Sequence, residues 1–323
     1  MATTNFKPKL LPIISSRQAA ANALKDIEEG MSEEQVVLLC RWEKVNYALL
    51  GGWRFCFTYV IGGLSGSGKS FFLNMIRKDF TNKFLNSRYK RKFRQLHIAF
   101  EMTAADEVLR DVSGQVKTSY GDIISAYKSI DGSRLSMEKY EEIKSYLQTI
   151  ADLEIDYVEV TGTVDQVEAT ILDWDQRYPD EQKIISLDHT LLTDFDKEVD
   201  EIALVANLSK MFLRVKKKIG SMNIIIAQLN GDIESESRMA RPTGHFPIGR
   251  DLYGGKSIRR DADAIMILNS PEKLGIAQYG VHKHDTKGII FWHLIKMRKA
   301  TTGYIRFQDD LRNGNLIQLE TNN

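Results

Sequence analysis

The chain has 323 residues, which suffice for one large domain or two modest ones, and its 43% hydrophobic and 27% charged residues exclude general disorder. The net charge of +1 and the pI near 7.7 argue against a protein that binds nucleic acid through a large overall positive charge. Any affinity for nucleic acid must therefore come from local clusters of basic residues.

The first 50 residues predict an N-terminal arm and a helical linker. Residues 1–17 contain two prolines and few helix-forming residues, which indicates an extended arm. Residues 18–48 predict helix with a break near residues 29–31, and Ser32 with Gln35 forms the pattern of a capping box for the second piece. Two interpretations stay open: a helical appendage that packs on the core, or an arm that docks on a neighbouring subunit.

From Arg54 onward the sequence predicts a series of short buried strands. The runs are apolar and rich in β-branched and aromatic residues, and they are too short for typical helices. The candidates are residues 55–61, 96–100, 155–160, 183–188, 223–229, 264–268, 289–295 and 303–307.

Helices are predicted between most of the earlier strands. After the first strand an apolar residue recurs at every fourth position, which predicts one buried helix face made of Phe72, Ile76, Phe80 and Phe84. Strands that alternate with helices need crossover connections, so the fold class is α/β with a mainly parallel twisted sheet flanked by helices. Fewer helices separate the strands after residue 260, which predicts an antiparallel C-terminal extension. Residues 51–323 thus form one predicted domain.

The sequence shows no sign of export or membrane insertion. Its two cysteines cannot build a disulfide framework, and no C-x-x-C pair suggests zinc. No apolar run approaches the length of a membrane span, and the N-terminus lacks the layout of a signal peptide. We therefore expect a cytoplasmic protein without membrane contact.

Residues 63–70, with the sequence GLSGSGKS, match the phosphate-loop motif G-x-x-x-x-G-K-[S/T] in full. The glycines let successive backbone N–H groups face the phosphates of ATP, and the following helix directs its positive end to the same place. Lys69 supplies a cation for the β- and γ-phosphates, and the Ser70 hydroxyl can ligate Mg²⁺. The strand before the motif and the helix after it argue against a turn without a ligand. The residues predicted to hold the nucleotide are Gly63, Ser65, Gly66, Ser67, Gly68, Lys69, Ser70 and Phe71.

Two carboxylates stand at the ends of predicted strands. Asp188 ends the strand 183–188 and is placed at the carboxyl edge of the sheet, where it can order Mg²⁺ together with Ser70. Glu101 follows the strand 96–100 and could hold the attacking water. The alternatives are an ordinary turn residue for Asp188 and a charge that complements a helix dipole for Glu101.

Six segments in this order make the chain resemble the motor domain of the DnaB-type hexameric replicative helicases, a RecA-like fold of helicase superfamily 4. The segments are GGLSGSGKS, FEMTAADEVLRDVSG, IISLDH, IIIAQLN, GGKSIRRDADAIMIL and LIKMRKATTGYIRF. The resemblance spans roughly residues 45–320. RecA-like recombinases and ATPases share this fold and some of these features.

The resemblance implies roles for individual residues. Glu101 is similar to the catalytic carboxylate of the family, and Asp188 to the carboxylate beside Mg²⁺. Gln228 looks like the glutamine that senses the γ-phosphate and couples it to the DNA loops. Lys296 and Arg298 match the pair that a neighbouring subunit presents to the nucleotide, where an arginine stabilises the charge of the transition state. The alternative for this pair is an exposed, charged strand end.

Residues 230–260 are long for a connection between two strands, which is typical of functional loops. In the family the corresponding region lines the central channel and holds single-stranded DNA by its backbone. Asp232, Glu234 and Glu236 dilute the positive charge, so a solvated loop remains the alternative. The basic residues of the segment are Arg238, Arg241, Arg250, Lys256, Arg259 and Arg260.

The chain departs from the family pattern in three places. The ~50 residues before the motor cannot hold the N-terminal helical domain through which replicative members bind primase. His189 and Thr190 follow Asp188 where relatives more often have tyrosine. Residues 82–95 are more basic than expected, which indicates either a solvated helix end or a second nucleic-acid or partner surface. A reduced motor of this kind would suit a phage or a mobile element.

The leading hypothesis is an ATP-dependent DNA helicase that moves along single-stranded DNA as a ring, a homo-hexamer in the family, with primase and a loader as possible partners. The second is a RecA-like, DNA-stimulated ATPase for recombination, loading or partner assembly that does not unwind DNA. The third is a binding protein that keeps the nucleotide site as a switch. The presence of both Glu101 and Arg298 argues against the third.

Overall fold

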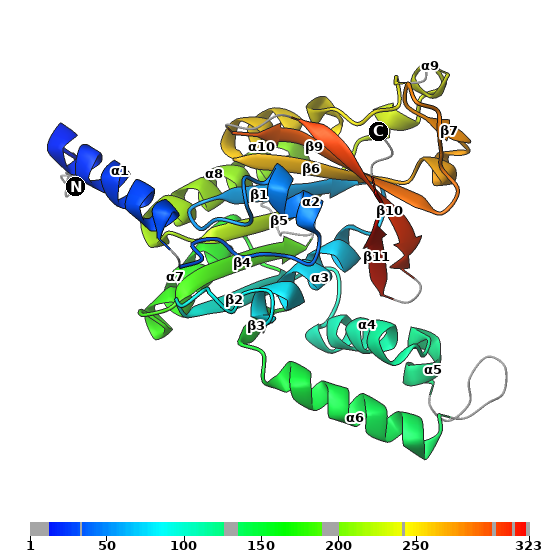
Figure 1. Ribbon diagram of the computed structural model, residues 1–323, viewed down its shortest axis with the longest axis horizontal. Coiled ribbons are helices and arrows are strands. Elements are labelled where there is room, and N and C mark those ends of the chain that lie inside the picture. Colours follow the sequence, from blue (N-terminus) through cyan, green and yellow to red (C-terminus); the bar gives the residue numbers. More distant parts are fainter. Residues whose placement is uncertain are drawn as a thin grey trace, which may run out of the picture.

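The computed structural model describes residues 13–32, 34–125, 135–188, 200–240, 243–298, 302–311 and 314–320. Within these residues a nine-stranded sheet carries helices on both of its faces (Figure 1). Six neighbouring strands run parallel, and three strands at one edge run antiparallel. The predicted α/β, RecA-like fold with its antiparallel C-terminal extension is therefore confirmed.

The strand order across the sheet is β11-β10-β9-β6-β1-β5-β4-β2-β3. The parallel strands are β1 (Thr58–Gly63), β2 (Phe93–Ala99), β3 (Ile155–Val158), β4 (Gln182–Asp188), β5 (Met222–Gln228) and β6 (Ala264–Asn269). The antiparallel strands are β9 (Ile289–Met297), β10 (Gly303–Asp310) and β11 (Asn315–Gln318). The sequence patterns did not predict β11, nor the separate pair β7 (Gln278–Tyr279) and β8 (His284–Asp285).

Helices cover the sheet in two layers. The first layer consists of α2 (Glu43–Ala48) and α3 (Lys69–Thr81), and the second of α7 (Val164–Arg177), α8 (Glu201–Ile219) and α10 (Gly255–Asp261). The helices α4 (Ala104–Val116), α5 (Tyr120–Ile124) and α6 (Met137–Ala151) project beyond β3, and α4 and α6 share a small core of their own (Figure 1). The remaining short helices are η2 (Gly231–Glu234), α9 (Glu236–Met239), η3 (Gly249–Asp251) and η4 (Pro271–Leu274).

Side chains of the buried strands alternate between two cores, as the two-residue period of a strand requires. On β6, Ala264, Met266 and Leu268 join the core beneath α3, whereas Ile265 and Ile267 join the core beneath α8. We call these two sides of the sheet the α3 face and the α8 face. Because both faces are covered, most positions of the parallel strands are apolar, which explains the short hydrophobic runs in the sequence.

The N-terminal segment differs from its prediction. The helix α1 (Ser16–Met31) ends at Met31, with Ser32 as its C-cap, and the prediction of a second helix that begins at Ser32 with a capping box to Gln35 is wrong. The side chain of Gln35 instead donates to the Oδ1 atom of Asn86, 51 residues further along, so a tertiary contact replaces the local one. Leu38 then pairs with Trp53 in an antiparallel bridge.

The two open interpretations of the N-terminal segment apply to different parts of it. Leu38, Val45 and Leu49 are fully buried in the core of the α3 face, so this part is packed on the motor. The helix α1 has no buried residue along its described length and stands clear of the sheet (Figure 1). Docking of α1 on a neighbouring subunit therefore stays a prediction.

The predicted helix face on α3 is confirmed for three of its four residues. Phe72, Ile76 and Phe80 are buried on the α3 face. Phe84 is 97% exposed, because α3 ends at Thr81 and the Oδ1 atom of Asn82 accepts from the Phe84 N–H. An asparagine side chain that bonds the backbone two residues later offers an alternative to helix, and here it ends the apolar pattern one turn early.

Candidate nucleotide and DNA site

The phosphate loop lies between the end of β1 and the start of α3. Gly66 and Gly68 have φ angles of 70° and 91°, which favour glycine over residues with a Cβ atom. A Cβ atom on Gly63 would lie 2.2 Å from the Oγ atom of Ser67, and one on Gly68 would lie 2.7 Å from Leu311. The motif glycines are thus required by the shape of the loop, which leads directly into a helix N-terminus.

Lys69 begins α3 and folds back over the loop. Its Nζ atom donates to the carbonyl oxygen of Leu64 at 2.7 Å, and the residue is buried. Burial lowers the pKa of Lys69, and the carboxylates of Asp188 and Glu101 oppose that shift. Negative phosphate groups are a stronger partner for this ammonium group than the single carbonyl it bonds in the free protein.

Asp188 ends β4 beside Ser70 and is almost completely buried. Among the described residues its Oδ1 atom has no hydrogen-bond partner. Burial raises the pKa of Asp188 to about 6; a hydrogen bond from Ser70 lowers the pKa, and Glu107 and Glu101 raise it. Mg²⁺ usually binds through one or two carboxylates together with substrate phosphates. A buried carboxylate with an unpaired oxygen beside a hydroxyl group fits that ion.

Glu101 and Gln228 lie at the same edge of the sheet. Ala99 pairs with Asp188, and the N–H of Phe100 donates to the carbonyl oxygen of Asp188 at 3.0 Å, which places Glu101 directly beyond this pair. Glu101 is exposed, as contact with water requires. Gln228 ends β5 opposite Gly63, the first residue of the loop. The structure therefore brings four predicted elements together: the loop, Asp188, Glu101 and Gln228.

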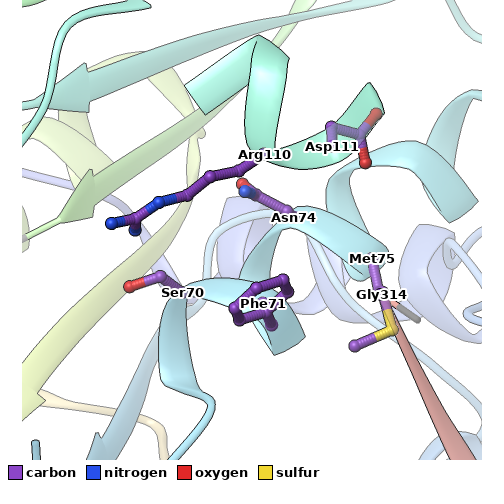
Figure 2. A pocket seen from close by; sticks show the side chains of 7 residues that line it. All are labelled: Ser70, Phe71, Asn74, Met75, Arg110, Asp111 and Gly314. Atoms are coloured by element: carbon purple, nitrogen blue, oxygen red, sulfur yellow. The ribbon is translucent and has the colours of Figure 1, made fainter. Parts of the chain in front are cut away.

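Two further residues, both on α4, face this region and were not predicted from the sequence. Arg110 lines a pocket with Ser70, Phe71 and Asn74, and its side chain extends from α4 toward Ser70 (Figure 2). Glu107 is buried, accepts from the Nδ2 atom of Asn74 at 3.0 Å, and raises the pKa of Asp188. The one signal in the sequence that could have indicated these residues is the presence of polar side chains among the apolar positions of α3 and α4. Their direction depends on how the two helices pack, which local spacing does not reveal.

Lys296 and Arg298 lie at the amino ends of the parallel strands. The phosphate loop of the same chain lies at the opposite, carboxyl ends of these strands. Lys296 is paired with Ile265 near the start of β6, and the Nζ atom of Lys296 donates to main-chain carbonyl groups at the end of α10. The backbone N–H of Arg298 donates to Asp263, five residues before Leu268, which pairs with Gly63. Five residues of extended strand span roughly 17 Å. The pair is therefore not brought to its own chain's nucleotide site.

The segment 230–260, predicted to be a long loop, contains several short helices. It contains η2, α9, η3 and most of α10, and Leu252 pairs back with Leu229 at the end of β5. Arg238 is held by Asp251 through two hydrogen bonds of 2.6 and 3.0 Å and is only 13% exposed along its side chain, so it stabilises the segment and does not face solvent. The exposed basic residues are Arg250, Lys256, Arg259 and Arg260, while Arg241 lies outside the described residues.

Comparison with known proteins identifies the family. Residues 42–312 match the DnaB-like helicase C terminal domain. The chain belongs to this family. A similar fold also appears in two solved structures, one described as an ATPase domain and the other as "The Structure Of A DnaB-Like Replicative Helicase And Its Interactions With Primase".

The two structures resemble the chain in fold at low sequence identity. The ATPase domain has 16% identity and a TM-score of 0.75, with 95% of this chain and 99% of that chain covered. The replicative helicase has 15% identity and a TM-score of 0.76, with 95% of this chain and 69% of that chain covered. A search of curated proteins by sequence found no match.

The DnaB-like assignment supports replicative helicase function in general, and with it ATPase activity, nucleotide and Mg²⁺. Two features that set this DnaB-like chain apart from the family pattern, His189 and Thr190, lie outside the described residues. In the part of the DnaB-like domain that the structure describes, no helix is long and apolar enough to cross a membrane.

The basic segment 82–95 is held largely by side-chain contacts. Arg91 forms an ion pair with Glu29 of α1 at 2.8 Å, and Arg94 pairs with Glu181 at 2.9 Å while it covers the ring of Tyr178. Both arginines therefore have partners within the chain, and Arg94, with 18% of its side chain exposed, is not a solvated residue.

Proposed function

We propose that this chain is an ATP-dependent DNA helicase motor that moves along single-stranded DNA as a ring oligomer, a homo-hexamer as in DnaB-type helicases. The observation that supports it most is the separation of the two halves of the site. The phosphate loop lies at the carboxyl edge of the parallel strands, and Arg298 lies at their amino edge. A head-to-tail contact between copies would place the Arg298 of one chain at the loop of the next, and such contacts form a ring when the rotation between copies closes.

The residues of one chain bind the nucleotide. Backbone N–H groups of the loop and the Nζ atom of Lys69 would receive the β- and γ-phosphates of ATP. Ser70 and Asp188 would hold Mg²⁺, which supplies positive charge against the oxygens of the two phosphates. Glu101 would orient the attacking water, since it stands exposed just beyond the buried Asp188. Arg110 would add a second cation beside Ser70.

The neighbouring chain completes the site. Arg298 would stabilise the charge that develops on the transferred phosphoryl group, a contribution of about 10³- to 10⁵-fold in rate for arginines that act this way. Lys296 would add charge beside it. Hydrolysis then depends on assembly, because no chain can supply both halves to one nucleotide.

DNA would be held by the segment 230–260, which follows Gln228 directly. Arg250, Lys256 and Arg259 are exposed and can contact backbone phosphates without sequence preference. Gln228 lies between the γ-phosphate site and this segment, so a change at the phosphate can move the segment. Primase and a loader are the partners we expect for a motor of this class.

ATP hydrolysis with and without single-stranded DNA, followed by strand displacement, tests the proposal on the wild type and on Lys69→Ala. We expect hydrolysis that DNA stimulates, displacement of a labelled strand, and loss of both in the variant. Stimulated hydrolysis without displacement would favour a RecA-like ATPase that does not unwind DNA. Binding of ATP without any hydrolysis would favour a nucleotide-dependent binding protein.

A further inference from the structure

The end of β9 contains one residue more than its partner strand. Ile265 pairs with Lys296, but the next residue, Met266, pairs with Leu294. Ile295 therefore has no partner in β6 and forms a β-bulge. A bulge bends its strand and changes the direction of the side chains that follow it.

The bulge moves the last side chains of β9 to the other face of the sheet. Leu294 and Met297 are three residues apart, yet both pack on the α3 face, whereas residues on one face of a regular strand are an even number apart. Ile295 packs on the α8 face, and Lys296 reaches the end of α10 there. If Ile295 were paired in a regular strand instead of forming the bulge, Lys296 and Arg298 would lie on the α3 face together with Leu294.

Asp263 meets Arg298 at this edge. The residue directly precedes β6 and is 4% exposed. Its Oδ2 atom accepts from the N–H of Thr58 at 2.8 Å and from the ammonium group of Lys216. Its Oδ1 atom lies 3.4 Å from the Nε atom of Arg298, whose own backbone N–H donates to the Asp263 carbonyl at 3.1 Å.

These contacts orient the guanidinium group. The side chains of Lys216 and Asp263 are 8% and 6% exposed, so the buried pair is rigidly surrounded, whereas the Arg298 side chain is 53% exposed. Nε is the nitrogen nearest to Asp263, and the terminal nitrogens Nη1 and Nη2 form the outer edge of the planar group. That edge can bind phosphate through two parallel hydrogen bonds.

We propose that Asp263 is the positioning residue for Arg298, and that the bulge at Ile295 and the buried Asp263 carboxylate together direct Arg298 toward solvent, where a neighbouring chain can meet it. The proposal rests on the shared nucleotide site described above. It assigns to Asp263 an effect on the site of the neighbouring chain, while the nucleotide site of its own chain keeps all of its residues.

Four variants test this role: Lys216→Met, the pair Lys216→Met/Asp263→Asn, Arg298→Ala, and all three changes combined. Removal of Asp263 alone would leave the Lys216 charge buried without a partner, which destabilises folded proteins strongly, whereas removal of both partners is often close to neutral. Lys216→Met serves as the matched background, because Asp263 then still has the Thr58 N–H and the Arg298 guanidinium group as partners. Thermal unfolding of each variant checks that the fold is kept.

We expect Lys216→Met to retain ATP hydrolysis within about threefold of the wild type, since Asp263 keeps its bond from Thr58. The pair should lower the kcat of DNA-stimulated hydrolysis by about 100-fold relative to that background, because small displacements of a catalytic group cost this much. The KM for ATP should stay within about threefold, because the phosphate loop is untouched. Adding Arg298→Ala to the pair should lower kcat no further than Arg298→Ala alone.

The outcomes separate this proposal from the proposed function. If the pair hydrolyses ATP as fast as Lys216→Met, or if its effect and that of Arg298→Ala add, Asp263 does not act through Arg298 and the proposal is overturned while the shared site stands. If Arg298→Ala alone hydrolyses ATP like the wild type, the shared site fails, and the role of Asp263 fails with it.

Discussion

At the scale of single residues, Asp188 makes the free protein less stable at neutral pH. Its pKa is raised to about 6 from 3.8, so the folded protein holds a proton that the unfolded chain has already lost between these values. Stability then falls as pH rises through this window, by about 2 to 3 kcal/mol in all. Asp188→Asn removes the effect, so nucleotide-free Asp188→Asn should be more stable than the wild type at pH 7.5 by that amount.

Urea unfolding at pH 4 and at pH 7.5 measures this difference. The advantage of Asp188→Asn should nearly vanish at pH 4, where the wild-type carboxyl group is largely neutral in the folded state and close to half neutral in the unfolded state, and ATP with Mg²⁺ should stabilise the wild type far more than the variant. An advantage of equal size at both pH values would show that it does not come from the charge of Asp188.

Lys273 contacts the phosphate loop from outside the motif. It lies on η4, is exposed, and its Nζ atom donates to the carbonyl oxygen of Gly66. One such hydrogen bond contributes about 0.5 to 1.5 kcal/mol, so Lys273→Met should release a fluorescent ADP analogue about 2- to 10-fold faster in stopped-flow experiments. Lys287→Met, a change of another exposed lysine in the same connection, is the control. Equal release from both variants contradicts a role for the Gly66 contact.

Single residues also show where prediction from sequence ends. Lys69, Ser70 and Asp188 could be predicted because a motif or a strand end places them, whatever the rest of the chain does. Glu107 and Arg110 could not, since their place beside Ser70 depends on how α4 packs against α3. Arg238 is one of the six basic residues of the segment 230–260, and its ion pair with Asp251 could not be predicted because it depends on how the segment folds.

At the scale of elements, Asn86 joins the N-terminal segment to α3. It is 8% exposed; its Oδ1 atom accepts from Gln35 and from the Leu39 N–H, and its Nδ2 atom donates to carbonyl oxygens that include that of Asp79. Loss of this amide leaves several buried groups unpaired, at about 1 to 3 kcal/mol each. Asn86→Ala should therefore lower the free energy of unfolding by about 2 to 4 kcal/mol in urea titrations.

Asn82→Ala provides the control for this element. Asn82 is exposed, and its side chain bonds only the backbone that follows α3, so a loss of about 1 kcal/mol or less is expected. A comparable loss in both variants would mean that Asn86 does not tie the N-terminal segment to the motor. The same contact explains why the helix predicted from Ser32 does not form: its start signal was local, and the bond from Gln35 to Asn86 is not.

The strands β1 to β6, in contrast, could be predicted, because their signal does not depend on one particular distant contact. Buried parallel strands carry apolar side chains on both faces, so β1 to β6 were visible as continuous runs. The bulge in β9 was not visible, because one extra residue in IIFWHLIKM changes the face of a side chain and leaves the composition the same. It nevertheless decides which way Lys296 and Arg298 point.

At the scale of the whole molecule, the two edges of the sheet carry complementary halves of one site, and mixing two inactive variants tests this. Arg298→Ala keeps its phosphate loop and Glu101 but presents no arginine, whereas Glu101→Gln presents Arg298 but cannot orient water. Each alone should hydrolyse ATP very slowly. In a random one-to-one mixture roughly one contact in four joins an intact loop side to an intact arginine side, so part of the wild-type rate should return.

The mixture distinguishes a shared site from two independent defects. If Arg298 acted within its own chain, every subunit in the mixture would still carry a complete defect, and no rate would return. A chain with both changes, mixed with the wild type at the same ratio, controls for dilution. Crosslinking of differently labelled chains confirms that mixed assemblies form. Because the distance across the sheet is set by strand pairing and not by side-chain rotamers, absence of rescue in such assemblies would exclude the shared site.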